Sequence, residues 1–148
     1  RRDLMRSLLD VNVVISLLDP DHDFHQRAHA WWRGHSEAGW ASCPMTENGV
    51  VRVMAHPGYN PERSLTVSVV SGLLRQFTAG TNHEFWPDAV SILDDAFIDT
   101  AKVLGPRQIT DVYLLALAAS RGGRLVTFDE SVHAAAAPQA SGQHLLVI

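Results

Sequence analysis

Short apolar runs alternate with longer amphipathic segments along this chain. Five short runs predict strands, at residues 7–11, 40–43, 83–86, 125–128 and 145–148. Six longer segments predict helices, at about 13–18, 21–36, 44–54, 65–77, 89–104 and 111–121. Because strands alternate with helices, we expect an α/β fold: a three-layer α/β/α domain with a mainly parallel central sheet.

Residues that favour helix ends set several of these boundaries. Asn12 is a competent N-cap for the first predicted helix, and Pro20 ends that helix. Pro44 suits the first turn of the third helix. We expect Thr110 to cap the last helix, which the glycine pair at 122–123 closes.

Length and composition suit one globular domain. With 148 residues, 46% of them hydrophobic, the chain can bury a substantial core. We expect a single domain over residues 5–148 and assign residues 1–4 to an N-terminal extension before the first strand. The formal net charge of −4 argues against a broadly basic surface for duplex DNA, but it is compatible with a small acidic site in a cleft.

Cysteine content and hydropathy predict a soluble, cytoplasmic protein. Cys43 is the only cysteine, which excludes an intrachain disulfide. No early segment has the form of a signal peptide. Polar residues interrupt every apolar stretch before the roughly 20 residues that a membrane span requires, so we expect no membrane partner.

Four carboxylates lie at predicted strand ends and helix starts: Asp10, Glu47, Asp111 and Asp129. Asp10 and Asp129 close strongly apolar runs, where parallel strands would end at the ligand-binding edge of the sheet. Each close pair of charges there would cost about 4 kcal/mol at roughly 4 Å and an effective dielectric near 20. Helix N-termini favour the ionised forms of Glu47 and Asp111. A divalent cation, Mg²⁺ or Mn²⁺, is the simplest counter-charge.

Three motifs carry a resemblance to a known family: LLDVNVVISLLDPDH from residue 8, TENGVVRV from residue 46 and ITDVYLLALAASRGGRLVTFD from residue 109. In this order they resemble the PIN-domain nucleases, and specifically the VapC-like toxins of type II toxin-antitoxin systems. The resemblance covers nearly the whole chain from Met5 onward. It implies that the four acids are the catalytic, metal-binding residues, and that two polar residues line the site beside them, Asn12 and Thr127.

The resemblance also implies an activity and partners. The expected function is a Mg²⁺-dependent endoribonuclease toxin that inhibits translation or growth, with Mn²⁺ able to substitute, and its products carry a 5′-phosphate and a 3′-hydroxyl. An RNA with an exposed single-stranded loop, such as tRNA or rRNA, is the expected substrate, because proteins read unstacked RNA bases. A cognate VapB-like antitoxin and a homodimer are the implied protein partners. Four arginines are either phosphate contacts or solvated surface residues: Arg52, Arg107, Arg121 and Arg124.

Other residue groups admit simpler readings. The histidines at 22, 25 and 29 share one helical face and could bind zinc, but an aspartate-rich, solvated helix start also explains them. Cys43 lacks the base and electropositive setting of a nucleophile. Trp31 and Trp32 lie about 100° apart on a helix, so we expect one to pack inward and the other to be partly covered, either by a partner or at the edge of the core.

Three other functions compete with the toxin. An aspartyl phosphotransferase or receiver domain would need a second early Asp and a well-placed lysine, whereas Lys102 falls in a predicted helix. A catalytically inactive binding module would not need the intact acid set. A housekeeping PIN-type RNA-processing nuclease is the main alternative, and a small neighbouring gene for a DNA-binding protein would favour the toxin over it.

Overall fold

The computed structural model describes residues 5–148, so the predicted extension at residues 1–4 lies outside the described residues. Five parallel strands form one sheet in the order β3-β2-β1-β4-β5. Their bounds are β1 Ser7–Leu9, β2 Trp40–Ser42, β3 His83–Phe85, β4 Arg124–Thr127 and β5 Leu145–Val147. The prediction of a mainly parallel α/β sheet is confirmed, and every strand pair in this part of the chain is parallel.

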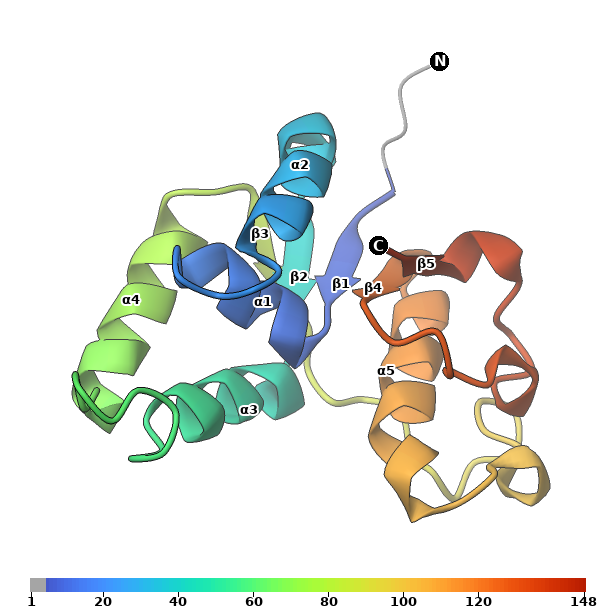
Figure 1. Ribbon diagram of the computed structural model, residues 1–148. Helices are drawn as coiled ribbons and strands as arrows, with labels where there is room; N and C mark the ends of the chain where they lie inside the picture. Colours follow the sequence, from blue (N-terminus) through green and yellow to red (C-terminus); the bar gives the residue numbers. More distant parts are fainter. Residues whose placement is uncertain (1–4) are drawn as a thin grey trace.

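Helices cover both faces of the sheet (Figure 1). One side carries α1 Val11–Leu18, α2 His25–His35, α3 Pro44–Met54 and α4 Val67–Ala79, and the other carries α5 Ile109–Ser120. Short 3-10 helices complete the chain: η1 Ser36–Ala38, η2 Thr100–Lys102, η3 Pro106–Gln108, η4 Ala134–Ala136 and η5 Gly142–His144. The arrangement is the predicted three-layer α/β/α fold. Over residues 5–148, every helix falls short of the length and apolar character that a membrane crossing demands.

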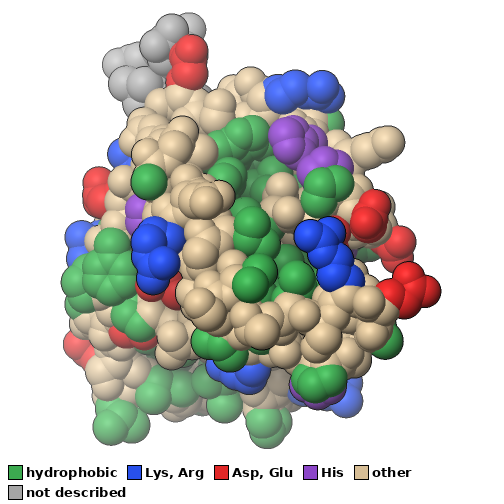
Figure 2. Space-filling model, turned by 90° about the vertical axis from the view of Figure 1, so that its left-hand side faces the viewer, with side chains coloured by type: hydrophobic (Ala, Val, Ile, Leu, Met, Phe, Trp, Pro, Cys, Tyr) green, Lys and Arg blue, Asp and Glu red, His purple; other side chains and the backbone are tan. Residues whose placement is uncertain are grey.

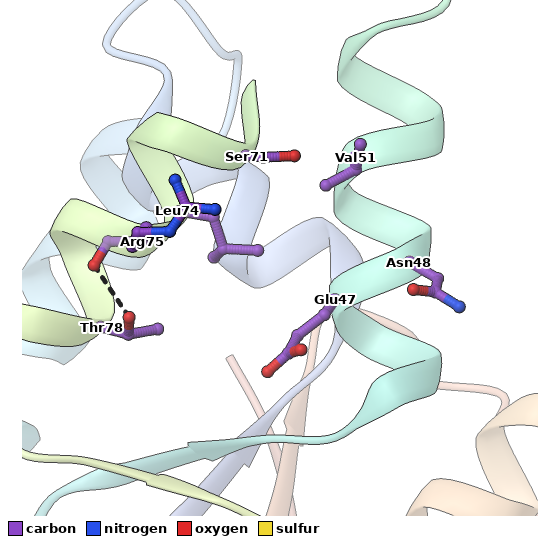
Figure 3. A pocket seen from close by; sticks show the side chains of 7 residues that line it. All are labelled: Glu47, Asn48, Val51, Ser71, Leu74, Arg75 and Thr78. Atoms are coloured by element: carbon purple, nitrogen blue, oxygen red, sulfur yellow. Dashed lines mark hydrogen bonds between the residues drawn. The ribbon is translucent and has the colours of Figure 1, made fainter. Parts of the chain in front are cut away.

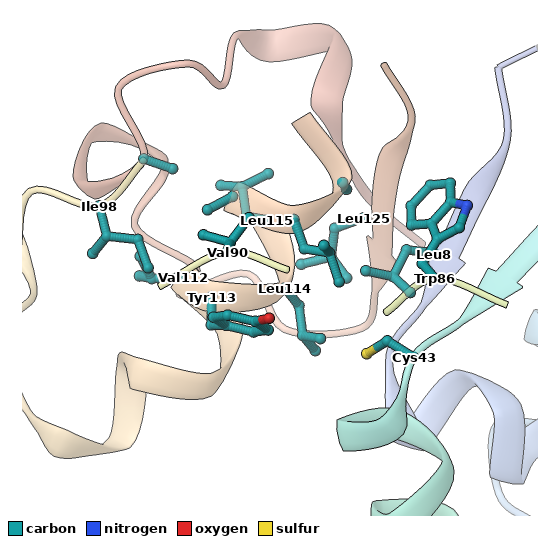
Figure 4. Close-up of a cluster of buried hydrophobic side chains, with 14 of the residues drawn as sticks. Leu8, Cys43, Trp86, Val90, Ile98, Val112, Tyr113, Leu114, Leu115 and Leu125 are labelled. Atoms are coloured by element: carbon teal, nitrogen blue, oxygen red, sulfur yellow. The ribbon is translucent and has the colours of Figure 1, made fainter. Parts of the chain in front are cut away.

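Alternating strand residues divide the core between the two faces. Leu8, Ala41 and Leu125 pack with the apolar residues of α5, and Figure 4 shows this cluster together with Trp86 and Ile98. The neighbouring positions Leu9, Trp40 and Val126 pack instead against α1 to α4. Both faces of the three central strands β1, β2 and β4 are therefore buried, as a parallel sheet between helices requires, while the edge strands β3 and β5 are partly exposed.

Two predicted N-caps are each wrong by two residues. Asp10, not Asn12, is the N-cap of α1, and its Oδ1 accepts a 2.8 Å hydrogen bond from the backbone N of Val11. The chain therefore turns into the helix directly after β1. Thr110 lies inside α5, because η3 leads straight into the helix and makes Gln108 its N-cap. The positions of Pro44 in the first turn of α3 and of Gly122 after α5, where φ is 67°, agree with the prediction.

The predicted helix at 89–104 is absent, and turns with the short η2 helix replace it. Asp94 accepts a hydrogen bond from the backbone N of Ala96, and Asp99 accepts one from the backbone N of Ala101. Such side-chain bonds offer the backbone an alternative to helical pairing. Val90 and Ile98 still reach the core, while Leu93 is 88% exposed. Apolar spacing alone therefore mispredicted the local structure here.

Candidate functional site

The ends of two adjacent strands begin the candidate site. Leu9 of β1 is registered with Val126 of β4, so the residues that follow both strands meet at one edge of the sheet. Thr127 Oγ1 donates a 2.8 Å hydrogen bond to Asp10 Oδ2 and accepts a 3.1 Å bond from the backbone N of Asp129. One hydroxyl therefore ties the two strand-end acids to each other.

Asp111 joins these acids from the first turn of α5. A hollow of about 380 Å³ is lined by Asp10, Asn12, Asp111, Thr127, Phe128 and Asp129. The structure thus brings together three of the four predicted acids and both predicted polar supports. The pattern of strand ends predicted this convergence, because the carboxyl ends of parallel strands lie at the same edge of the sheet.

The three acids are not equivalent electrostatically. The pKa of Asp111 rises from 3.8 to about 7, first because the carboxyl is buried, then because of the charge of Asp10, and then through a hydrogen bond and the charge of Asp129. The pKa of Asp129 is lowered, chiefly by hydrogen bonds from Ser131. Burial and neighbouring charges therefore oppose the effect of the helix N-terminus, and in the metal-free protein Asp111 is only partly ionised near neutral pH. Asp111 and Asp129 therefore favour a state in which they share one proton.

Ser131 is a site residue that the sequence analysis missed. Its backbone N and its Oγ donate hydrogen bonds of 2.8 and 2.6 Å to Asp129 Oδ1. An Asp followed two residues later by Ser is a common turn signal, so the spacing in DES could have indicated it. Ser131 fixes one oxygen of Asp129 and stabilises its charge.

Glu47 lies apart from the residues that line the acid hollow. It lines a cleft of about 340 Å³ between α3 and α4, together with Asn48, Val51, Ser71, Leu74, Arg75 and Thr78 (Figure 3). The predicted four-acid cluster is therefore divided, with three acids in one hollow and Glu47 in a neighbouring cleft.

A short hydrogen-bond chain holds Glu47 in this cleft. Ser42 Oγ donates a 2.6 Å bond to Glu47 Oε2, and His83 Nε2 lies 2.7 Å from the same Oγ. Because the hydroxyl hydrogen is used toward Glu47, the imidazole must place its own hydrogen on Nε2 and donate it to Ser42. Burial lowers the pKa of His83, which favours this neutral ring. Sequence spacing does not indicate this chain of bonds, because His83 lies 41 positions from Ser42 and on another strand.

Comparisons with known proteins agree with this architecture. The sequence pattern of the PIN domain matches residues 7–138. The chain belongs to the PIN-domain family. Ribonuclease VapC44 of Mycobacterium tuberculosis (strain ATCC 25618 / H37Rv) is 49% identical over 144 residues, which are 97% of this chain and 100% of that protein. Ribonuclease VapC39 of the same strain is 42% identical over 128 residues, covering 86% of this chain and 91% of VapC39. The predicted resemblance to VapC-like PIN proteins is therefore confirmed.

A solved structure shares the fold. The chain is similar to one in the crystal structure of VapBC2 from Rickettsia felis bound to a DNA fragment from their promoter, with a TM-score of 0.59 and 10% identity. The match covers 97% of this chain and 99% of that chain. At this identity the likeness supports the PIN fold alone.

The other candidate groups in this PIN domain have structural roles. His25 Nδ1 lies 2.7 Å from the carbonyl oxygen of Ser16, and His22 Nδ1 accepts a 3.0 Å bond from the backbone N of Phe24. Cys43 is fully buried, and burial raises the pKa of its thiol, which opposes a nucleophilic role. Among residues 5–148, no three His, Cys, Asp or Glu side chains are arranged to hold a metal ion together.

Two of the predicted phosphate contacts lie at the wrong end of the fold. Arg124 begins β4 and Arg121 follows α5, whereas the acids lie after β4 and at the start of α5. Along the helix axis Arg121 is about 15 Å from Asp111, at 1.5 Å per residue. Arg121 packs over the ring of Trp86, 5.8 Å from its centroid. These two arginines therefore make structural contacts near the amino ends of the strands, away from the acids at the carboxyl ends.

Proposed function

We propose that this chain is a metal-dependent endoribonuclease toxin of the VapC type, which cleaves RNA phosphodiester bonds. The observation that carries the proposal is the convergence of Asp10, Asp111 and Asp129 in one hollow at the carboxyl edge of the sheet. The relatives named as ribonucleases support RNA as the substrate.

The donor set suits Mg²⁺ or Mn²⁺. Hard divalent cations prefer carboxylate oxygens, and Mg²⁺ commonly uses one or two carboxylates and keeps several waters. Such partial coordination needs no complete cage of protein ligands. We assign the ligand role to the three clustered acids, with Asn12 and Thr127 as polar supports. When bound, the cation would supply an activated water for attack on phosphorus.

The acids of the site differ in how they are held and in whether they carry a proton. Thr127 and Val11 fix both oxygens of Asp10, and Ser131 fixes one oxygen of Asp129. The raised pKa of Asp111 leaves its carboxyl partly protonated near neutral pH in the metal-free protein, so cation binding releases part of a proton. We assign Glu47 a supporting acidic role from the adjoining cleft, where Ser42 fixes its carboxylate.

The substrate class follows from the chemistry of RNA recognition. An unpaired loop exposes bases that a protein can stack on and hydrogen-bond, whereas duplex RNA hides them in a deep, narrow groove. We therefore propose tRNA or rRNA loops as substrates, with a 5′-phosphate and a 3′-hydroxyl on the products. Cleavage of either RNA would inhibit translation and growth.

We also propose control by a VapB-like antitoxin and assembly into a homodimer. Hydrophobic side chains form a band over the α4 side of the molecule, with Lys or Arg side chains along its margins (Figure 2). Trp31 and Trp32 of α2 are both half-buried, in contrast to the prediction that one packs inward, and Trp32 contacts Phe77 of α4. An antitoxin tail could cover this surface with apolar side chains and place an Arg or Lys in the acid hollow.

An RNA cleavage assay tests the enzymatic proposal. The purified full chain should cleave tRNA or rRNA with Mg²⁺, lose this activity with a chelator, and recover it when Mg²⁺ is restored. Cleavage that persists in the chelator, or in the Asp129→Asn variant, would overturn the metal-dependent assignment. Glu62→Gln, a change of an exposed acid distant in sequence from the site, is the matched control and should cleave normally.

Co-expression with the product of the adjacent small gene tests the toxin role. A cognate antitoxin should co-purify and suppress cleavage, and reversing the charge of its tail Arg or Lys to Glu should weaken both effects. Unchanged inhibition after that reversal would refute charge substitution in the acid hollow. Failure of the neighbouring product to bind would favour the RNA-processing alternative.

A further inference from the structure

Two phenylalanines from distant parts of the chain meet beside the acid hollow. Phe24 precedes α2 and Phe128 follows β4, and their ring centroids lie 4.9 Å apart at an interplanar angle of 57°. This is an ordinary distance for a tilted aromatic pair. The pair brings the α1–α2 connection against the segment that carries Asp129.

Phe128 belongs to the wall of the hollow, between Thr127 and Asp129. Phe24 extends the aromatic surface outward and is 41% exposed. Phe128 is half-buried against the core, and the ring of Phe24 packs on it and extends toward solvent. We name this pair the aromatic shelf.

Helix capping does not account for Phe24, whose ring packs instead against Phe128 and Arg27. It occupies the N-cap position of α2, where Ser, Thr, Asp or Asn would satisfy a free backbone N–H, and it makes no side-chain capping bond. An apolar ring at this position cannot accept a hydrogen bond from a backbone N–H, so a polar residue would stabilise the helix start better. A ligand that covers the ring would explain the choice.

A positive charge adjoins the shelf. The guanidinium carbon of Arg27 lies 5.1 Å from the centroid of Phe24 and 5.2 Å from that of Phe128. Arg27 also donates a hydrogen bond to the carbonyl oxygen of Ile148, which helps to fix it in place. The site therefore presents, in order, carboxylates for a cation, aromatic rings, and an arginine.

We propose that the aromatic shelf binds an unpaired nucleobase of the RNA next to the scissile phosphate, with Arg27 close to the neighbouring backbone phosphate. Aromatic rings bind any base through its π-face, and Arg complements the phosphate charge. This inference rests on the proposed ribonuclease function and adds a substrate-positioning site to it. Phe24 and Phe128 are positioning residues that hold the RNA strand over the acids.

Binding to short RNA tests the shelf separately from cleavage. The full chain carrying Asp10→Asn keeps the RNA intact, and single-stranded oligoribonucleotides with one 2-aminopurine report base stacking by fluorescence quenching. In that background, Phe24→Leu and Phe128→Leu should each abolish the quenching and weaken RNA binding roughly 5- to 150-fold, the range expected for loss of one stacked base. Phe128→Tyr should retain both properties.

Phe85→Leu is the matched control. Phe85 is also exposed, at 51%, but lies on the edge strand β3 away from the residues that line the hollow. Its variant should bind and quench like the parent. In the active chain, the Phe24 and Phe128 changes should raise KM more than they lower kcat, with thermal melts showing that Phe24→Leu remains folded.

The results separate the shelf from the proposed function. Unchanged quenching and affinity in both Leu variants would overturn the shelf, even if the parent chain cleaves RNA normally. Loss of antitoxin binding with intact RNA binding would also overturn it and assign the rings to a protein partner. A parent chain that binds RNA with quenching but never cleaves would keep the shelf and refute the ribonuclease.

Discussion

Thr127 Oγ1 donates a 2.8 Å hydrogen bond to Asp10 Oδ2 and so joins the ends of β4 and β1. The same oxygen accepts the backbone N–H of Asp129. Thr127 is 1% exposed, so water cannot replace these bonds without a rearrangement. The orientation of two site acids therefore depends on one buried hydroxyl.

Replacing this hydroxyl should impair the site more than the fold. Thr127→Val keeps the shape but leaves Asp10 and the backbone N of Asp129 without their partner. We expect RNA cleavage to fall about 10- to 100-fold, with a loss of about 1–2 kcal/mol in the free energy of unfolding. Cleavage assays and urea titrations would measure both, and Thr127→Ser should retain most activity. Full activity of Thr127→Val would show that catalysis does not depend on the hydrogen bonds that Thr127 makes to Asp10 and Asp129.

Neutral variants of the acids should separate activity from stability. Asp10→Asn, Asp129→Asn and Glu47→Gln are each expected to abolish cleavage, and the folded state should be intact or more stable where clustered negative charge is relieved. Cleavage with Mg²⁺ and thermal melts without metal measure the two effects. Normal cleavage by the Asp129 variant would remove the basis for a shared cation site.

Asp111 should make stability depend on pH. Its folded pKa of about 7 exceeds the ordinary 3.8, so its protonated form adds stability that is complete below pH 4 and is lost as pH rises toward and through 7. Asp111→Asn stays neutral, so it should match the parent only below pH 4, and its advantage over the parent should grow by about 1–2 kcal/mol between pH 5 and pH 8, after discounting for partial exposure. Melts in chelator at both values test this.

The contribution of Asp129 to stability changes with pH in the opposite direction, and it changes in the acid range, outside the pH 5 to 8 comparison of Asp111→Asn. Its pKa is lowered, so its stabilising charge is lost only as pH falls through the acid range. Glu62→Gln controls for general charge effects. A difference between parent and Asp111→Asn that is constant from pH 5 to 8 would contradict the raised pKa of Asp111.

Cation binding should release a proton near neutral pH. Mg²⁺ needs ionised Asp111, whereas the metal-free carboxyl is largely protonated at pH 6. We expect Mg²⁺ or Mn²⁺ to bind more tightly at pH 8 than at pH 6, and Ca²⁺ to support cleavage poorly because its looser geometry misplaces the attacking water. Calorimetry in buffers of different ionisation enthalpy measures the proton. Stoichiometric zinc that Mg²⁺ cannot replace would point to the histidines of α2 instead.

Gly49 allows α3 to approach α1 closely. A Cβ at this position would lie 2.6 Å from Val11 Cγ2, which is closer than real contacts permit. Gly49→Ala should therefore destabilise the protein by about 1–3 kcal/mol, although Ala is the better helix former. Val11→Ala in the same chain should recover part of the loss, as a double-mutant cycle would show. A Gly49→Ala variant more stable than the parent would exclude the steric constraint.

The sequence predicted the parts of this fold that depend on local pattern. Apolar runs located the strands, and parallel pairing explains why Asp10 and Asp129 meet at one edge. Tertiary packing determined the rest. Glu47 lines the α3–α4 cleft, where Ser42 donates to its carboxylate and His83 contacts Ser42, and no spacing along the chain encodes the contact between Ser42 and His83.

Two further errors have the same origin. The stretch at 89–104 has helical spacing, but Asp94 and Asp99 bond to nearby backbone N–H groups and favour turns. Asp111 occupies a helix start that favours its charge, yet burial among other acids raises its pKa. Both outcomes depend on competition between local and non-local interactions, which a single sequence does not display.

The order of the strands has a consequence during protein synthesis. Asp10 is made early, but the hydroxyl that orients it and the acid that completes the hollow belong to the end of β4. β1 also needs β4 as its lateral neighbour in the sheet. A ribosome-bound chain that has not yet released residue 129 therefore lacks the assembled site. Chains that end before residue 129 would lack the assembled site, so cleavage would require synthesis to pass this point.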